Sequence, residues 1–186
     1  QVYLHQLSYV VGQEVLDRAL LRYFKEWKFK HPTPDDFLRI VEKESGLVLD
    51  WYHEYFVNST ATIDYAIRAI EQYGEETQIT LEKVGRMPMP IEVHIKYQGG
   101  EEELHYMPLV MMHDRKVFAD SLDVIHHEPW PWTNPTYTLK LSKPAAEIVS
   151  IEIDPSLRMA DVDRSNNMVL LPEDLRYIFY PGSSDD

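Results

Sequence analysis

The spacing of apolar residues changes partway along this chain, and that change limits the fold more than any other feature. Up to about residue 66, apolar side chains recur every three or four positions, which is the spacing of an amphipathic helix. From about Thr77 they alternate with polar side chains, as in a strand with one buried face. The sequence therefore predicts an α+β chain whose helices and strands occupy two segregated regions.

Four antiparallel helices are expected in the first region. One carries Leu4, Leu7 and Val11 and stops at Gly12, and a longer helix runs from about Glu14 to Phe29. Short connections between such helices favour antiparallel packing as a bundle or stack.

Helix-capping residues locate the remaining two helices. Thr33 suits an N-cap and Pro34 the first helical position, while Gly46 marks the end of that helix. The fourth helix should begin near Asp50 and present several aromatic side chains.

The alternating pattern of the second region predicts an antiparallel sandwich of the immunoglobulin-like kind, with about five to seven strands. The expected strands cover residues 78–84, 91–97, 101–109, 137–141 and 148–153. The predicted organisation is thus a helical domain at 1–66, a β-sandwich domain at 67–180 and a disordered tail at 181–186.

Composition excludes several classes of function. The formal net charge is −13, so the surface repels phosphate backbones and anionic lipids, and neither nucleic acid nor a membrane is an expected partner. Cysteine is absent, which excludes disulfides, thiolate metal ligands and a cysteine nucleophile. No run of 18 apolar residues is present.

The histidines do not form the helical zinc motif H-E-x-x-H, whose two histidines must lie four positions apart. His-Glu pairs occur at 53–54 and 127–128. Val57 occupies the place of the second histidine in the first string, and Pro129 and Pro131 prevent a regular helix in the second. No catalytic residue and no metal ligand is therefore assigned.

Two weaker interpretations concern side chains around residue 130. His126 and His127 could join a metal site with a distant carboxylate, although a polar loop is the simpler interpretation. Trp130 and Trp132 could stack on sugar rings, although a connection covering the edge of the sandwich is commoner. The aromatic residues that could form an interaction surface, rather than only packing, are Trp27, Trp51, Tyr55, Trp130 and Trp132.

Several motifs follow one another in a distinctive order along both regions. They are Leu4–Glu14, Leu20–Phe24, Phe29–Phe37, Glu44–Trp51, Arg86–Pro90, Trp130–Pro135 and Ile153–Asp161. Together they resemble the end of the catalytic domain and the following β-rich domain of bacterial gluzincin metallopeptidases, the aminopeptidase N and leukotriene A4 hydrolase family. The resemblance covers most of residues 1–170 and consists of structural rather than catalytic motifs.

The resemblance implies that this chain lacks the zinc-binding and catalytic residues of its parent enzyme. Members of this family remove N-terminal residues from peptides with a zinc ion held by H-E-x-x-H and a downstream Glu. A Tyr that stabilises the oxyanion precedes the Leu-rich helix, whereas Tyr3 and Tyr9 lie within that helix and do not take its role. No cofactor is therefore expected in this chain, and zinc is expected in the intact enzyme.

The leading hypothesis is a non-catalytic C-terminal portion of a zinc aminopeptidase-like metallopeptidase, forming a wall of the catalytic domain and a docking β domain. Its partners would be the upstream catalytic domain of the same polypeptide and, for the intact enzyme, peptide substrates. The helical face left uncovered would favour self-association. The alternatives are a free-standing immunoglobulin-like module that binds protein or glycan, and a different enzyme with a scattered site. The sequence itself does not indicate a cellular compartment, whereas the resemblance favours a periplasmic or exported protein.

Overall fold

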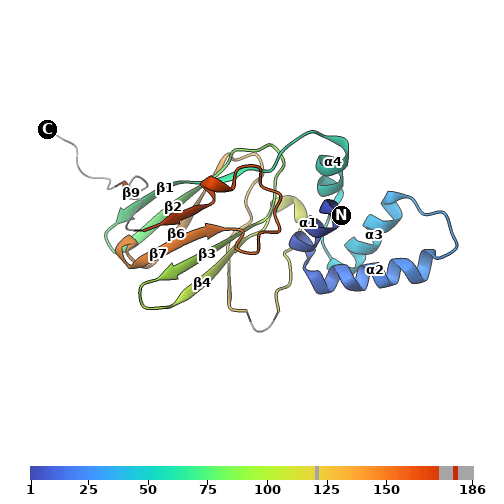
Figure 1. Ribbon diagram of the computed structural model, residues 1–186, viewed down its shortest axis with the longest axis horizontal. Coiled ribbons are helices and arrows are strands. Elements are labelled where there is room, and N and C mark those ends of the chain that lie inside the picture. The colour runs from blue at the N-terminus through green and yellow to red at the C-terminus, as the bar shows by residue number, and fades with distance from the viewer. Residues whose placement is uncertain (120–121, 172–177, 180–186) are drawn as a thin grey trace.

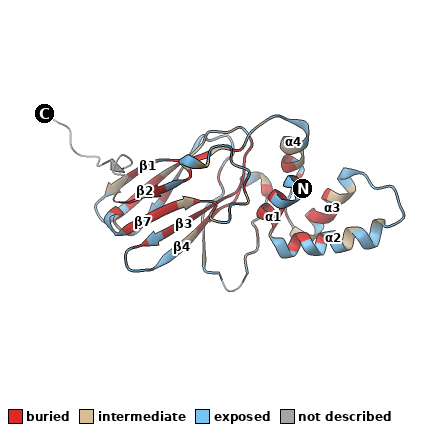
Figure 2. Ribbon diagram, in the orientation of Figure 1, coloured by how far each residue is buried: buried red, intermediate tan, exposed pale blue. Residues whose placement is uncertain are grey.

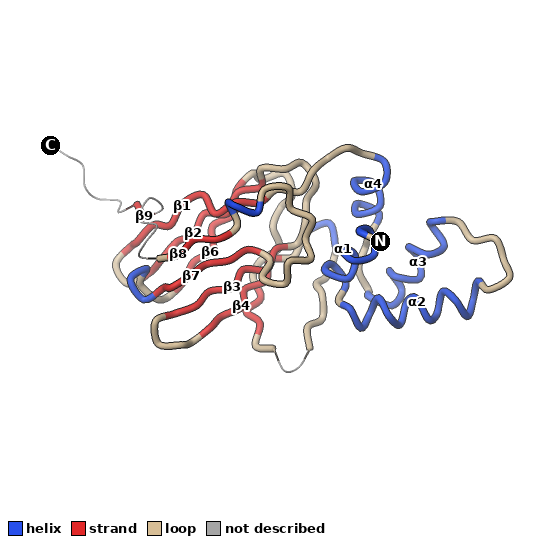
Figure 3. The backbone as a smooth tube through the Cα atoms, viewed as in Figure 1, coloured by secondary structure: helices blue, strands red, loops and turns tan. Residues whose placement is uncertain are grey.

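The helices lie at one end of the molecule and two β-sheets at the other (Figures 1 and 3). This computed structural model describes residues 1–119, 122–171 and 178–179. The predicted α+β chain, with helices before strands, is confirmed. In the described ranges, no helix is both long and apolar enough to cross a membrane.

The four expected helices are present. They are α1 (Val2–Val11), α2 (Gln13–Trp27), α3 (Pro34–Ser45) and α4 (Asp50–Asn58). Gly12 separates α1 from α2 with φ 91°, a conformation that suits a residue without a Cβ, and donates its N–H to the carbonyl of Ser8. Helix α2 ends at Trp27, two residues before the expected end, and the next turn places Phe29 at φ 66° in full exposure.

Helix α3 begins and ends where its capping residues predict. The backbone N–H and the hydroxyl of Thr33 both donate to the carboxylate of Asp36, each at 2.8 Å. At the other end Gly46 adopts φ 75° and donates its N–H to the carbonyl of Glu42. These contacts satisfy backbone groups that the helix itself leaves without partners.

In the part of the chain that the structure describes, nine strands form two sheets. They are β1 (Tyr65–Tyr73), β2 (Glu76–Lys83), β3 (Ile91–Tyr97), β4 (Glu102–Met107), β5 (Val124–His126), β6 (Thr136–Leu141), β7 (Ile148–Ile153), β8 (Met168–Leu170) and β9 (Ile178–Phe179). The sheet orders are β6-β2-β1-β9 and β5-β4-β3-β7-β8. Neighbouring strands are antiparallel except for the β1–β9 and β4–β5 pairs.

Strand β1 was not predicted, because its register shifts between Ile67 and Ala69 and the shift interrupts the alternation of buried side chains. The strand begins at Tyr65, inside the expected helical range 1–66. The expected tail, 181–186, lies outside the described residues.

One apolar core extends through both sheets and into the helices (Figure 2). Ile70 and Ile79 come from one sheet and Ile95 and Ile151 from the other, and all four side chains are completely buried. Leu7 of α1 is equally buried in the same cluster. Packing therefore joins the two regions that differ in sequence periodicity.

A buried ion pair joins α1 to the β-region, which is the part of the chain that contains the two sheets. The ammonium group of Lys116 pairs with the carboxylate of Glu92 and donates to the carbonyl of Tyr9 at 2.9 Å. The rings of Tyr9, Tyr106 and Phe118 enclose it, with centroids 4.8, 5.5 and 4.5 Å away. Burial lowers the pKa of Lys116, and the charge of Glu92 opposes that effect. We call Lys116, Glu92 and Tyr9 the α1 clasp.

The loop after β7 holds α1 from a second side. Its first residue, Asp154, is completely buried and accepts the backbone N–H of Arg158 at 3.3 Å. The guanidinium of Arg158 donates to the carbonyl of Ser8 at 3.2 Å, and the side-chain oxygen of Gln6 accepts the N–H of Ala160 at 2.8 Å. The β-region thus supplies hydrogen-bond partners for the carbonyl of Ser8 and the side-chain oxygen of Gln6.

Candidate functional site

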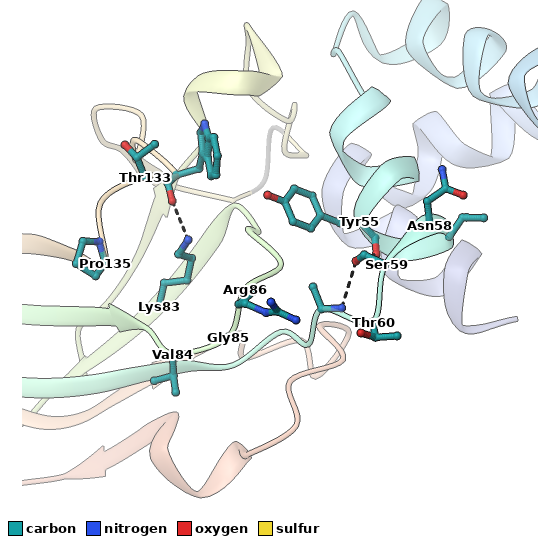
Figure 4. Close-up of a pocket in the computed structure, with 13 residues that line it drawn as sticks. Tyr55, Asn58, Ser59, Thr60, Lys83, Val84, Gly85, Arg86, Thr133 and Pro135 are labelled. Atoms are coloured by element: carbon teal, nitrogen blue, oxygen red, sulfur yellow. Dashed lines mark hydrogen bonds between the residues drawn. The ribbon is translucent and has the colours of Figure 1, made fainter.

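A groove lies between α4 and the turn that follows β2 (Figure 4). Its volume is about 940 Å³, and it is lined by residues 55, 57–61, 83–86, 132, 133 and 135. Figure 4 shows Tyr55 projecting from α4 toward the wall that carries Lys83 and Thr133. That volume lies in the range of sites that hold small molecules or short peptide segments.

Two basic side chains lie in this groove. The ammonium group of Lys83 donates to the carbonyl of Trp132 at 2.7 Å and lies 6.0 Å from the centroid of its indole ring. Partial burial lowers the pKa of Lys83. Arg86 is exposed, and its side chain extends from the turn toward the segment after α4 that carries Ser59 and Thr60 (Figure 4). The groove can therefore present two cations beside two aromatic rings.

A glycine allows the floor of the groove to form. The backbone N–H groups of Val84 and Gly85 both donate to the carbonyl of Asp64, at 2.9 and 2.8 Å. A Cβ atom on Gly85 would lie 2.4 Å from the carbonyl oxygen of Thr62, which is closer than real contacts allow. This close approach fixes the turn that carries Arg86, one of the residues that line the groove.

The structure brings together two of the five aromatic residues assigned to an interaction surface. Trp132, with 41% of its surface exposed, and the half-buried Tyr55 both line the groove. Trp27 is half-buried at the end of α2, away from them, with the ammonium group of Lys30 5.6 Å from its ring centroid.

The other two aromatic residues lie inside the protein. Trp130 is 1% exposed and packs between Tyr65 and Tyr137, whose ring centroids are 5.6 and 5.3 Å away. Trp51 is also buried and donates its indole N–H to the carbonyl of Val48 at 2.9 Å. In this structure neither indole ring is available to a ligand.

A second, apolar groove of about 640 Å³ runs between α1, α2 and the loop after β7. The apolar side chains that line it are Val2, Leu4, Leu16, Leu20, Leu157 and Met159. Leu157 is 64% exposed and adopts φ 55°, an unfavourable conformation for a leucine. Beside the groove, Leu21 and Phe24 of α2 are 62% and 66% exposed. We call this surface the α1–α2 face.

A chain of polar side chains crosses the five-stranded sheet, from Tyr97 on β3 through Glu103 and His105 on β4 to His127, just after β5. One ring nitrogen of the buried His105 lies 2.8 Å from His127 and the other 3.1 Å from the carboxylate of Glu103. Tyr97 donates its hydroxyl to the same carboxylate at 2.7 Å. Burial is the main cause that lowers the pKa of His127 to about 4, and His105 and His126 lower it further.

This histidine cluster does not fit zinc. Both ring nitrogens of His105 are occupied, one by His127 and one by Glu103, so the rings bond to each other rather than aim at a common point. His126 turns toward Tyr106 and Phe118 instead. Within residues 1–119, 122–171 and 178–179, no group of three or more His, Asp or Glu side chains is arranged to hold a metal ion.

Sequence reasoning missed the residues that give the groove and the clasp their charge. Lys83 ends a strand and Arg86 begins the motif Arg86–Pro90, so neither stands out in the sequence. Glu92 follows a buried apolar residue in an alternating strand, which predicts exposure, yet the side chain is buried against Lys116. The proline-rich segment after Arg86 was the one available signal of an unusual turn.

Comparison with known proteins adds no family assignment. No family model matches this chain, and no curated protein matches it. The resemblance to gluzincins thus rests on the order of the sequence motifs alone.

Proposed function

We propose that this chain is the non-catalytic C-terminal portion of a zinc aminopeptidase-like metallopeptidase. The order of motifs from Leu4–Glu14 to Ile153–Asp161 supports the family, and the missing H-E-x-x-H motif supports a non-catalytic role. In this proposal zinc and the peptide substrate belong to the upstream catalytic domain. The two sheets would form its immunoglobulin-like docking domain.

The observation that carries the proposal is the α1–α2 face. Val2, Leu21 and Phe24 are each more than half exposed, and the apolar groove lies beside them. Exposed apolar surfaces of this kind mark contacts with other proteins. We propose that helices of the upstream catalytic domain cover this face, and that an isolated chain self-associates through it.

A reconstitution experiment tests the docking. The upstream part of the native reading frame is expressed as a separate polypeptide with this chain, and the dissociation constant of the complex is measured by calorimetry. Leu157→Glu and Leu20→Glu should each weaken the complex at least tenfold, since burying a leucine contributes about 1.5–3 kcal/mol. Leu170→Glu, on the exposed side of β8, serves as the matched control.

The control separates docking from general destabilisation. All three variants should melt cooperatively near the wild-type temperature, and Leu170→Glu should bind as the wild type does. Absence of a complex, or equal weakening by all three variants, would contradict the proposed role of the α1–α2 face.

A free-standing binding module is the competing function. The groove that contains Tyr55 and Trp132 favours it, because an aromatic groove can hold a ligand without any upstream domain. A native reading frame with no upstream H-E-x-x-H segment would favour the module over the peptidase.

A further inference from the structure

The groove beside α4 differs in charge from the rest of the protein. The whole chain carries a formal net charge of −13, whereas the residues lining this groove include Lys83 and Arg86 and no Asp or Glu. Opposite charge attracts a ligand most effectively where a concave wall concentrates the field. This groove would therefore attract an anionic ligand on an otherwise acidic surface.

Carboxylates on the flanking segments do not neutralise these two cations. The carboxylate of Glu82 is 2.7 Å from the guanidinium of Arg68, on the neighbouring strand. Asp64 accepts from the side-chain amide of Asn166 at 3.0 Å, and Glu54 accepts from Asn58 at 2.8 Å. Across the described ranges, neither Lys83 nor Arg86 forms an ion pair within 4 Å, so both cations remain available to a ligand.

The remaining walls are suited to apolar parts of a ligand. Tyr55 faces the groove from α4 (Figure 4), and Trp132 also lines the groove with 41% of its surface exposed. Tyrosine and tryptophan offer large contact areas at low entropic cost. A guanidinium group can in addition hold a carboxylate through two parallel hydrogen bonds.

We propose that this groove binds an acidic peptide segment, with carboxylates on Lys83 and Arg86 and apolar side chains against Tyr55 and Trp132. The inference concerns the isolated chain and does not depend on the peptidase assignment. A glycan fits less well, because each sugar hydroxyl needs acceptors as well as donors, and no carboxylate lines the groove.

Calorimetric titration of the wild-type chain tests the proposal. The probe is the acetylated, amidated pentapeptide Phe-Asp-Glu-Phe-Asp, and its matched neutral form is Phe-Asn-Gln-Phe-Asn. The acidic peptide should bind at least tenfold more tightly than the neutral one, and less tightly as salt is raised. Its binding should also shift the indole N–H resonance of Trp132 and leave those of the buried Trp51 and Trp130 in place.

Matched variants assign the binding to the groove. Arg86→Gln and Lys83→Gln should each weaken binding of the acidic peptide about tenfold or more, as expected for hydrogen bonds between charged groups. Lys140→Gln removes an exposed positive charge from β6, outside the groove, and should leave binding unchanged. Circular dichroism checks that each variant keeps the wild-type fold.

Each of three outcomes would overturn the proposal. The first is no binding of the acidic peptide, and the second is equal binding of both peptides. The third is binding that survives both groove substitutions. A hyaluronan hexasaccharide provides a further arm, and its binding in place of the peptide would assign the groove to an acidic glycan.

Discussion

Helix α1 and the α2–α3 hairpin are neighbours in sequence but differ in how they are held. Gln6, Ser8 and Tyr9 of α1 are all buried and bond with groups of the β-region. The hairpin extends away from the sheets, and its two helices are joined by partly exposed ion pairs from Arg18 and Arg22 to Glu44. Its helix α2 carries the exposed apolar residues Leu21 and Phe24.

The difference shows that sequence periodicity locates secondary structure but not packing partners. The change from helical to strand spacing places α1 with the other helices, yet its buried polar side chains bond with strands and loops more than 80 residues away. Buried polar residues in a helix mark its partner, because each needs a specific hydrogen bond.

The largest effect should come from breaking the α1 clasp. Lys116→Met leaves the carboxylate of Glu92 buried without its partner, and we expect a loss of about 3–5 kcal/mol in the free energy of unfolding. Urea denaturation measures this loss. The double variant Lys116→Met with Glu92→Leu should recover most of it, since an apolar pair can replace a buried ion pair.

The hairpin supplies the matched control for the clasp. Arg22→Gln removes ion pairs with Glu26 and Glu44 that are open to solvent, and the urea midpoint should barely change. If Arg22→Gln lowered the free energy of unfolding as much as Lys116→Met, the proposed difference between how α1 and the hairpin are held would be contradicted.

A smaller, pH-dependent effect should come from the β-region. His127 has a folded pKa of about 4, whereas an unfolded histidine titrates near 6.5. The neutral form of His127 contributes to the free energy of unfolding. This contribution is complete above pH 6.5 and is lost as the pH falls toward 4, because the histidine of the unfolded state binds a proton at a higher pH than that of the folded state. At pH 5 the loss should be about 1 kcal/mol, which allows for partial solvation of the ring.

Urea denaturation at pH 7, 6 and 5 checks this effect. His127→Gln should flatten the decline in stability between pH 7 and 5, whereas His31→Gln, on the exposed connection between α2 and α3, should leave it unchanged. An unchanged slope in His127→Gln would mean that this histidine is not kept neutral by the fold.

Features set by local contacts could be predicted from the sequence, and those set by distant contacts could not. Thr33, Pro34 and Gly46 define α3 through interactions within a few residues, and the alternation in 91–97 defines β3. The clasp joins residues 24 and 107 positions apart, so no local pattern indicates that Lys116 is buried.

The candidate site was predictable only in part. Trp132 and Tyr55 could be singled out as aromatic candidates for an interaction surface, but their meeting in one groove depends on how α4 returns toward the sheets. Trp51 and Trp130 are singled out in the sequence for the same reason, their aromatic side chains, yet both lie in the core. Residue type alone does not distinguish an aromatic side chain that binds a partner from one that packs.

Metal analysis and peptidase assays on two polypeptides test the central claim most directly. One is this chain, and the other is the chain extended upstream along its native reading frame. Both are dialysed, analysed for zinc and assayed with aminoacyl-nitroanilides. The proposal predicts one equivalent of zinc and turnover in the extended polypeptide, and neither in this chain, which lacks H-E-x-x-H. Zinc retention with turnover in this chain alone, or an extended polypeptide with neither, would contradict it.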